Sequence, residues 1–244
     1  MAVTAVTQAR IYVGSFEFTS FSNQAEWGGD VAVKEVTTFG TDFQQFVPSL
    51  KTFQCNTAGF NDYAGASVDE VVRGLYGSRR VATLTNTTPA TGNLAHVGQG
   101  IVGGWRAINI AAPGDVPSTG IVIGDGYTAT GQLTQISTST VTATGNSTPV
   151  NVGAVATGRT ILAAIHVLSV TGTTPSLTAQ LASSTTSGGA YTARGTAGAA
   201  ITAAGDQLIT AAGPFTDTWW RLNYTVSGTT PVFTVVASIA ITAA

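Results

Sequence analysis

The clearest structural signal in this chain is the segment Trp219-Trp220-Arg221-Leu222-Asn223-Tyr224-Thr225-Val226, in which apolar and polar side chains alternate. In an extended backbone, successive side chains point to opposite sides, so every second residue shares a face. One face is apolar and consists of Trp220, Leu222, Tyr224 and Val226. The other face carries the polar residues Arg221, Asn223 and Thr225. This alternation predicts an antiparallel β-strand with one side on a core.

The next segment along the chain, residues 232–241, alternates in the same way. Its large apolar side chains are Phe233, Val235, Ile239 and Ile241. Between the two segments, Ser227–Pro231 contains glycine and proline, which are typical of turns. The sequence therefore predicts a β-hairpin whose apolar faces contribute strongly to the core.

Outward from this hairpin, the same two-residue period recurs through most of the chain. It predicts further strands at residues 9–19, 31–38, 81–86, 101–111, 129–143, 160–170 and 176–182. The turn segment also has an earlier echo, because Val170–Pro175 resembles Val226–Pro231 residue by residue. Equivalent hairpins of a β-sandwich would produce this echo, and chance in so threonine-rich a chain is the alternative. The expected fold class is mainly β, an antiparallel β-sandwich or barrel.

One short α-helix is predicted, over about residues 67–76. Ser67 and Glu70 have the spacing of a capping box, in which both side chains bond backbone amides of the first turn. The apolar residues that follow recur at helical spacing: Val68, Val71, Val72 and Leu75. Gly77 is placed to end the helix. We expect the apolar stripe to pack over an open face or end of the sheet.

The chain is poor in charge. Only 9% of its 244 residues are charged and the formal net charge is −2, whereas about a quarter of the residues are charged in an ordinary soluble domain. Hydrophobic residues make up 43%, which is the opposite of a disordered composition. We therefore expect much of the surface to be buried against copies of the same chain. The alternative is a monomer whose surface is rich in threonine. The near-neutral balance argues against a dedicated nucleic-acid or membrane-surface binder.

The N-terminal segment lacks the basic and apolar regions of a secretory signal, and no apolar run is long enough to span a bilayer. We expect no membrane anchor. Composition changes at the threonine- and serine-rich residues 134–148, after which charges are few. The predicted boundary separates a β-barrel core with one helix, residues 1–148, from a C-terminal β-sandwich portion, residues 149–244. The second portion is either a separate domain or an integral part of the same fold.

No catalytic, cofactor or metal site is predicted, and we expect the protein not to be an enzyme. Gly98–Gly103 matches GxGxxG, but a dinucleotide site needs a helix after it, and a strand-like segment follows here. His96 and His166 lie far apart in the chain and have no neighbouring ligand residues. Cys55 is expected to be a small apolar side chain in a strand. Helix capping already accounts for the carboxylate pair Asp69-Glu70.

A candidate assembly segment is Val36–Leu50, which contains Phe39, Phe43 and Phe46 around Asp42. It is too often interrupted by polar residues for a core strand and too apolar for a free loop. We expect it to be mobile in the monomer and ordered against a neighbouring subunit. A locally packed long loop is the alternative.

Several segments resemble the major tail (tail tube) proteins of bacteriophages with long, non-contractile tails. Ala9–Phe18 is similar to the opening strand of that family, and Lys34–Asp42 to its V-T-x-F-G run. Val47–Lys51 is similar to a P-G-L-K run, with Ser49 in place of the usual glycine. Gly59–Asp62 is similar to a glycine–aromatic–acid turn, and the predicted helix follows where the family has one. The later segments 163–168, 181–184 and 219–224 resemble the C-terminal part of actinophage-type tail proteins.

The resemblance implies a tail-tube β-barrel or sandwich that forms rings, expected to be hexameric, which stack into a tube for DNA. The implied partners are further copies of the chain and the tape-measure, tail-tip and tail-terminator proteins, with genomic DNA only in transit. The implied location is the virion tail, after synthesis in the bacterial host cytoplasm. Closing strands across subunits would satisfy exposed sheet edges, and a head-to-tail contact that closes makes a ring.

Arg79 and Arg80 are the one adjacent basic pair in the chain. A lumen that neutralises few phosphates would let DNA slide, so we expect both residues at a subunit contact or on the outer surface. Their position after the helix suggests pairing with Asp69, with Glu70 or with a neighbouring subunit. The candidate assembly residues are thus Phe39, Asp42, Phe43, Phe46, Arg79 and Arg80.

Two other functions remain open at this stage. One is another virion β protein, such as a capsid decoration or tail-tip protein. The other is a carbohydrate-binding β-sandwich that uses exposed members of the set Trp27, Trp105, Trp219 and Trp220. The adjacent residues Trp219 and Trp220 face opposite sides of a strand, so these two cannot form a single platform.

Overall fold

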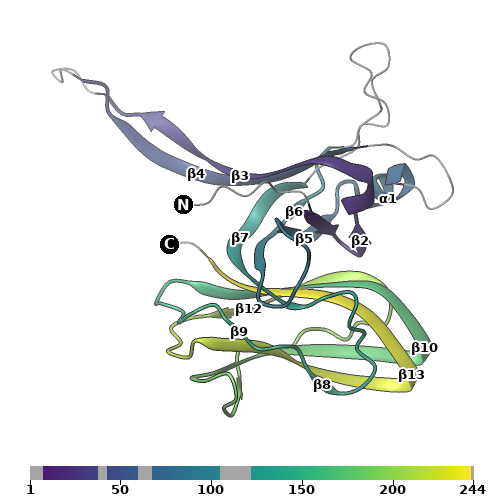
Figure 1. Cartoon of the computed structure of the whole chain (residues 1–244). Coiled ribbons are helices and arrows are strands. Elements are labelled where there is room, and N and C mark those ends of the chain that lie inside the picture. Colours follow the sequence, from purple (N-terminus) through teal and green to yellow (C-terminus); the bar gives the residue numbers. More distant parts are fainter. Residues whose placement is uncertain (1–7, 38–42, 60–67, 105–121, 243–244) are drawn as a thin grey trace.

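The computed structural model describes residues 8–37, 43–59, 68–104 and 122–242. Within these ranges the chain is mainly β, its strands pair antiparallel, and it has a single α-helix. Figure 1 shows a β-sandwich, a second layer of strands above it, and a long hairpin that projects from this upper layer. The predicted fold class is therefore confirmed.

The sandwich is built on two long strands, β10 (Thr160–Ser184) and β13 (Trp219–Thr242), which pair along their whole lengths. Ile161 lies opposite Ile241, and Ser184 lies opposite Trp219. Each strand bends, so the first half of β10 pairs with the second half of β13 in one sheet, and the remaining halves pair in the other (Figure 1). The predicted hairpin between residues 219–226 and 232–241 is wrong, because both belong to β13 and each pairs with β10.

The bend lies at the two echo segments, which face each other across the strand pair. Gly172 and Gly228 have φ angles of 117° and 114°, a region in which side chains with a Cβ are strained. A Cβ on Gly172 would lie 2.7 Å from the carbonyl oxygen of Thr230, and a Cβ on Gly228 would lie 2.7 Å from that of Thr174. The pairing register shifts here, as at a β-bulge. The echo is thus a local two-fold arrangement that bends both strands together.

Short strands complete the sandwich around this pair. β12 (Gly205–Ala212) pairs with the first half of β10, and β11 (Thr192–Ala193) pairs with its end. β8 (Gly145–Asn146) and β9 (Val150–Asn151) pair with the first half of β13. The core contains the predicted apolar faces, including the buried side chains Trp220, Leu222, Tyr224, Phe233, Val235 and Ile239.

The upper layer continues one sheet of the sandwich. β7 (Val122–Gln135) pairs with the second half of β13, and the sheet then runs through β6 (Leu94–Ile101), β5 (Arg79–Thr85), β1 (Arg10–Val13) and β2 (Phe16–Glu17). A 3-10 helix, η1 (Thr19–Phe21), follows β2. The sheet curls back over the sandwich, so apolar residues of the two layers share buried clusters.

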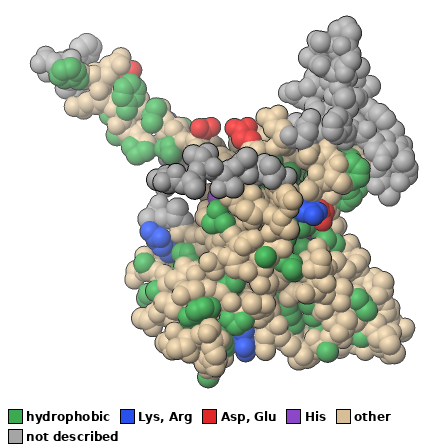
Figure 2. Space-filling model, in the orientation of Figure 1, with side chains coloured by type: hydrophobic (Ala, Val, Ile, Leu, Met, Phe, Trp, Pro, Cys, Tyr) green, Lys and Arg blue, Asp and Glu red, His purple; other side chains and the backbone are tan. Residues whose placement is uncertain are grey.

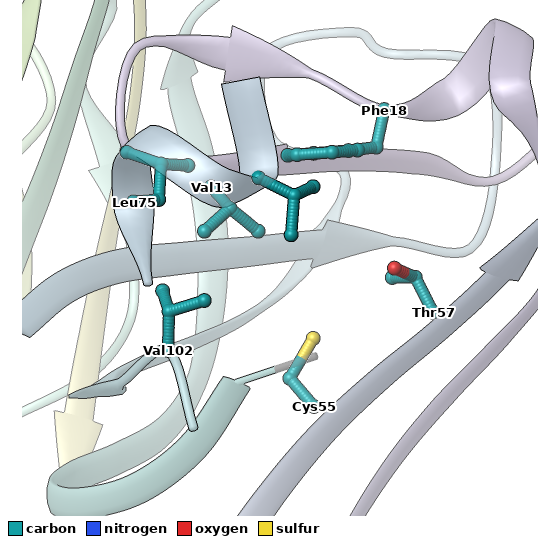
Figure 3. A pocket seen from close by; sticks show the side chains of 7 residues that line it. Val13, Phe18, Cys55, Thr57, Leu75 and Val102 are labelled. Carbon is teal, nitrogen blue, oxygen red and sulfur yellow. The ribbon is translucent and has the colours of Figure 1, made fainter. Parts of the chain in front are cut away.

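The helix α1 (Val68–Leu75) confirms the predicted helix, while its proposed cap, Ser67, lies outside the described residues. Val68 and Val72 are buried on the outer face of the upper layer. Beside the helix is a cavity of about 10 Å³, lined by apolar side chains and Thr57. Figure 3 shows Val13, Leu75 and Val102 around this space, with the Cys55 sulfur directed toward it.

Several strand boundaries differ from those predicted. The strand expected at 101–111 is observed only at Ile101, where β6 ends, and residues 105–111 lie outside the described ranges. The strand expected at 31–38 is the end of β3 (Ser22–Glu35), and β4 (Phe46–Gly59) was not predicted. β4 is interrupted by polar residues, and this pattern hides a strand that has little core to face.

Candidate assembly surface

β3 and β4 form the long hairpin of Figure 1, termed here the arm, which consists of residues 22–37 and 43–59. The register runs from Ser22 opposite Gly59 to Glu35 opposite Phe46. The amide of Val36 then donates to the carbonyl of Gln45 at 2.8 Å, which extends the pairing beyond both strands.

The base of the arm is anchored in the upper layer. Phe53 of β4 lies opposite Gly124 of β7, which joins the arm to the sheet. The rings of Trp27 and Phe53 lie 4.5 Å apart, and a Cβ on Gly98 would lie only 2.5 Å from the Phe53 ring. Glycine at position 98 therefore allows the aromatic base to sit flat on β6.

The outer arm, residues 28–37 and 43–48, is exposed along both strands. It carries more than half of the exposed large hydrophobic side chains in the described chain: Val31, Val33, Val36, Phe43, Phe46 and Val47. Val33 is 64% exposed, Phe43 84% and Phe46 55%. Figure 2 shows hydrophobic side chains along this projection. A two-stranded ribbon without a third strand or a covering element is marginally stable in water, and exposed apolar patches commonly mark interaction sites.

The predicted candidate residues fall in different places. Phe43 and Phe46 lie on the outer arm, whereas Phe39 and Asp42 lie outside the described residues. The sequence analysis did not single out Val31 and Val33, because an alternating strand looks the same whether its apolar face meets a core or solvent. The strand's place at the tip of a hairpin, which the printed sequence does not reveal, distinguishes the two.

Arg79 and Arg80 lie at the start of β5, away from the outer arm. The expected partner is wrong for Arg80, which pairs with Asp206 of β12 at 3.1 Å. Asp206 also accepts a hydrogen bond from the amide of Val81 at 2.7 Å. Arg79 is exposed. Arg80 therefore ties the curled sheet to the sandwich within one chain.

A buried histidine lies in the same contact. Nδ1 of His166 is 2.8 Å from the carbonyl oxygen of Gly14, and Nε2 is 2.8 Å from the hydroxyl of Thr83. A carbonyl can only accept, so Nδ1 carries the proton and Nε2 accepts from Thr83. Burial lowers the pKa of His166. This imidazole is a neutral structural bridge between β10, β5 and the β1–β2 turn.

The remaining reactive groups have structural surroundings. Burial raises the pKa of Cys55 to about 12, so it stays a thiol near neutral pH. Gly98–Gly103 lies in β6 and just beyond it, in a strand where a dinucleotide site would need a loop. In the part of the chain that is described, no three His, Cys, Asp or Glu side chains come close enough to hold a metal ion.

Within the same ranges, none of the helical structure is long and apolar enough to cross a membrane. Comparison with protein-family models, with curated proteins and with solved structures found no match for this chain.

Proposed function

We propose that this protein is a structural virion subunit that assembles into stacked rings and forms a phage tail tube through which DNA passes. The observation that carries the proposal is the outer arm, an apolar two-stranded ribbon exposed on both faces and anchored at its base. The low charge of the chain and the resemblance of several segments to tail tube proteins point in the same direction.

The arm is suited to contact another copy of the chain. β3 pairs only with β4 among the described strands, so its other edge presents unpaired backbone groups along the arm. Such an edge is a template for further strand pairing unless it is protected. Burial of the arm's valine and phenylalanine side chains on a neighbouring subunit would cover both the edge and the apolar faces. A repeated contact of this kind, head to tail, generates rings and tubes.

Under this proposal the other partners are the tape-measure, tail-tip and tail-terminator proteins, and the location is the virion tail. Genomic DNA is in contact only in transit. The near-neutral charge of the chain supports passage, because a channel wall with few Lys and Arg neutralises few phosphates.

Electron microscopy and size-exclusion chromatography of the purified full-length protein test the proposal. The unmodified chain is expected to form rings or tubes. Val33→Asp and Phe46→Asp place a charge on the outer arm and are expected to leave folded monomers. The matched control is Tyr76→Asp, which changes a 57% exposed side chain away from the arm and is expected to assemble.

The outcomes separate the alternatives. A wild-type protein that stays monomeric at every concentration would overturn the proposal, as would arm variants that form normal tubes. Discrete trimers without tubes would favour a capsid decoration or tail-tip protein instead.

A further inference from the structure

A polar hollow of about 310 Å³ lies at the edge of the sandwich, beyond the end of β7. Its wall includes six residues with hydroxyl or amide side chains: Gln135, Ser139, Thr140, Thr142, Asn146 and Tyr224. None of the described residues that line it is charged, and Val141 and Ala143 add apolar surface. It lies far along the chain from the arm and is independent of the proposed assembly contact.

The segment that walls the hollow is held at both ends. Val141 exchanges two backbone hydrogen bonds with Phe233, at 2.9 and 3.0 Å. Further along, Gly145 lies opposite Tyr224 in the β8–β13 pair. The hydroxyl of Thr144 accepts from the Val226 amide at 3.0 Å. The segment thus bridges the two halves of β13, and the hollow is part of the folded framework.

Tyr224 forms part of this wall from the core side. Its side chain is 2% exposed, and its hydroxyl has no hydrogen-bond partner among the described residues. A buried hydroxyl without a partner is unfavourable, and native structures normally supply one. Burial raises the pKa of Tyr224, so the hydroxyl remains protonated and can both donate and accept.

We propose that the hollow binds one ring of a neutral saccharide. Hydroxyl and amide groups both donate and accept, which matches the hydroxyls of a sugar. The uncharged lining disfavours a phosphate or an ionised ligand. The apolar surface of Val141 and Ala143 suits the C–H face of a sugar ring, and the volume lies at the lower end of the range for small-molecule sites.

Saturation-transfer NMR on the full-length protein tests this assignment, with methyl α-D-glucopyranoside and N-acetyl-D-glucosamine as probes. At least one probe is expected to bind with a dissociation constant in the millimolar range. Tyr224→Phe removes only the hydroxyl and is expected to weaken binding about tenfold. Ala143→Trp fills the hollow from an exposed position and is expected to abolish binding. Tyr191→Phe is the matched control, because it removes a hydroxyl that bonds the Ser187 carbonyl elsewhere.

Two results would overturn the assignment. The first is the absence of transfer to either probe, which would mean that water alone occupies the hollow. The second is binding that Tyr224→Phe and Ala143→Trp leave unchanged, which would place the sugar elsewhere. Circular dichroism of each variant distinguishes lost binding from lost folding.

Discussion

His166 is the side chain most sensitive to its surroundings in the contact between the curled sheet and the sandwich. Burial lowers its pKa from the ordinary value of 6.5, and the Gly14 carbonyl and the Asp206 carboxylate oppose that effect only in part. Tyr12 is the other titratable group facing it, with ring centroids 5.9 Å apart. Arg80 balances the charge of Asp206 in the same contact. The folded state therefore favours the neutral imidazole.

A lowered pKa has a defined effect on stability. The folded state binds fewer protons than the unfolded state, so stability is lost as the pH falls below the unfolded pKa of about 6.5. We predict that the urea midpoint, followed by tryptophan fluorescence, decreases between about pH 7.5 and about pH 5. His166→Gln should flatten this dependence, and His96→Gln, at a half-buried ring, should flatten it less. An unchanged pH dependence in His166→Gln would contradict this role.

Phe233 shows what a single core side chain contributes. It is fully buried in the sandwich, so Phe233→Ala removes apolar contacts and leaves a cavity. We predict a loss of about 3–5 kcal/mol in the free energy of unfolding, measured by urea denaturation. Phe46→Ala, at a 55% exposed ring on the arm, should change the stability of the monomer by about 0.5 kcal/mol or less. Equal losses in the two variants would mean that the arm packs within the monomer.

These residues also show how far the sequence predicts side-chain surroundings. The two-residue period placed Trp220 and Phe233 on buried faces, because a strand alternates strictly. The same period did not reveal that Val33 faces solvent. The partner of Arg80 was wrong because Asp206 follows it by 126 residues and is brought near only by the curl of the sheet. Parity is a local property, whereas contact between distant segments is not.

At the scale of elements, the bend in β10 and β13 depends on glycine at two related positions. Gly172→Ala and Gly228→Ala each place a Cβ against a carbonyl oxygen, at backbone angles that alanine rarely adopts. We predict that each substitution destabilises the protein by roughly 1–3 kcal/mol, as measured by urea denaturation. Gly188→Ala is the matched control, since a Cβ there meets nothing within 4 Å. A neutral effect at both corner glycines would show that the strands can bend without them.

The arm is the element whose protection should depend most on assembly. Its amides lie in a ribbon that no further described strand covers, so they should exchange quickly in the monomer. We predict that hydrogen exchange slows across residues 28–37 and 43–48 when tubes form, while amides shared by β10 and β13 exchange equally slowly in both states. Mass spectrometry of monomer and tube makes the comparison. Equal protection of the arm in both states would argue against it as an assembly surface.

The helix and the main strands of the sandwich were predictable, while their pairing was not. The segments 219–226 and 232–241 carry the right faces, yet they continue one strand instead of forming a hairpin. A Gly-Thr-Thr-Pro sequence is compatible with a tight turn and also with a bulged bend. The choice depends on the opposite strand, which carries the matching echo at residues 170–175. Of the candidate site, the aromatic residues were found and the strand edge that presents them was not.

At the scale of the whole molecule, the two portions predicted from composition share strands and core. β7 precedes residue 148, yet its outer end pairs with the last residues of β13, from Ala237 to Thr242. Val97 and Ala129 of the upper layer form one buried cluster with Leu162 and Ala164 of β10. Arg80–Asp206 and Thr83–His166 add polar links across the same contact.

This sharing predicts the result of truncation. A chain ending at Gly145 would expose the apolar face that carries Val97 and Ala129, and it would leave β7 with an unpaired edge. Loss of a buried face of this size exceeds what a marginally stable domain tolerates. We predict that this fragment is insoluble or unfolds without cooperativity, and that deleting residues 219–244 has the same result because β13 pairs with both β10 and β7. The measurements are soluble yield and thermal unfolding by circular dichroism. A fragment ending at Gly145 that stays soluble, melts cooperatively and forms tubes would show instead that the C-terminal portion is a dispensable addition.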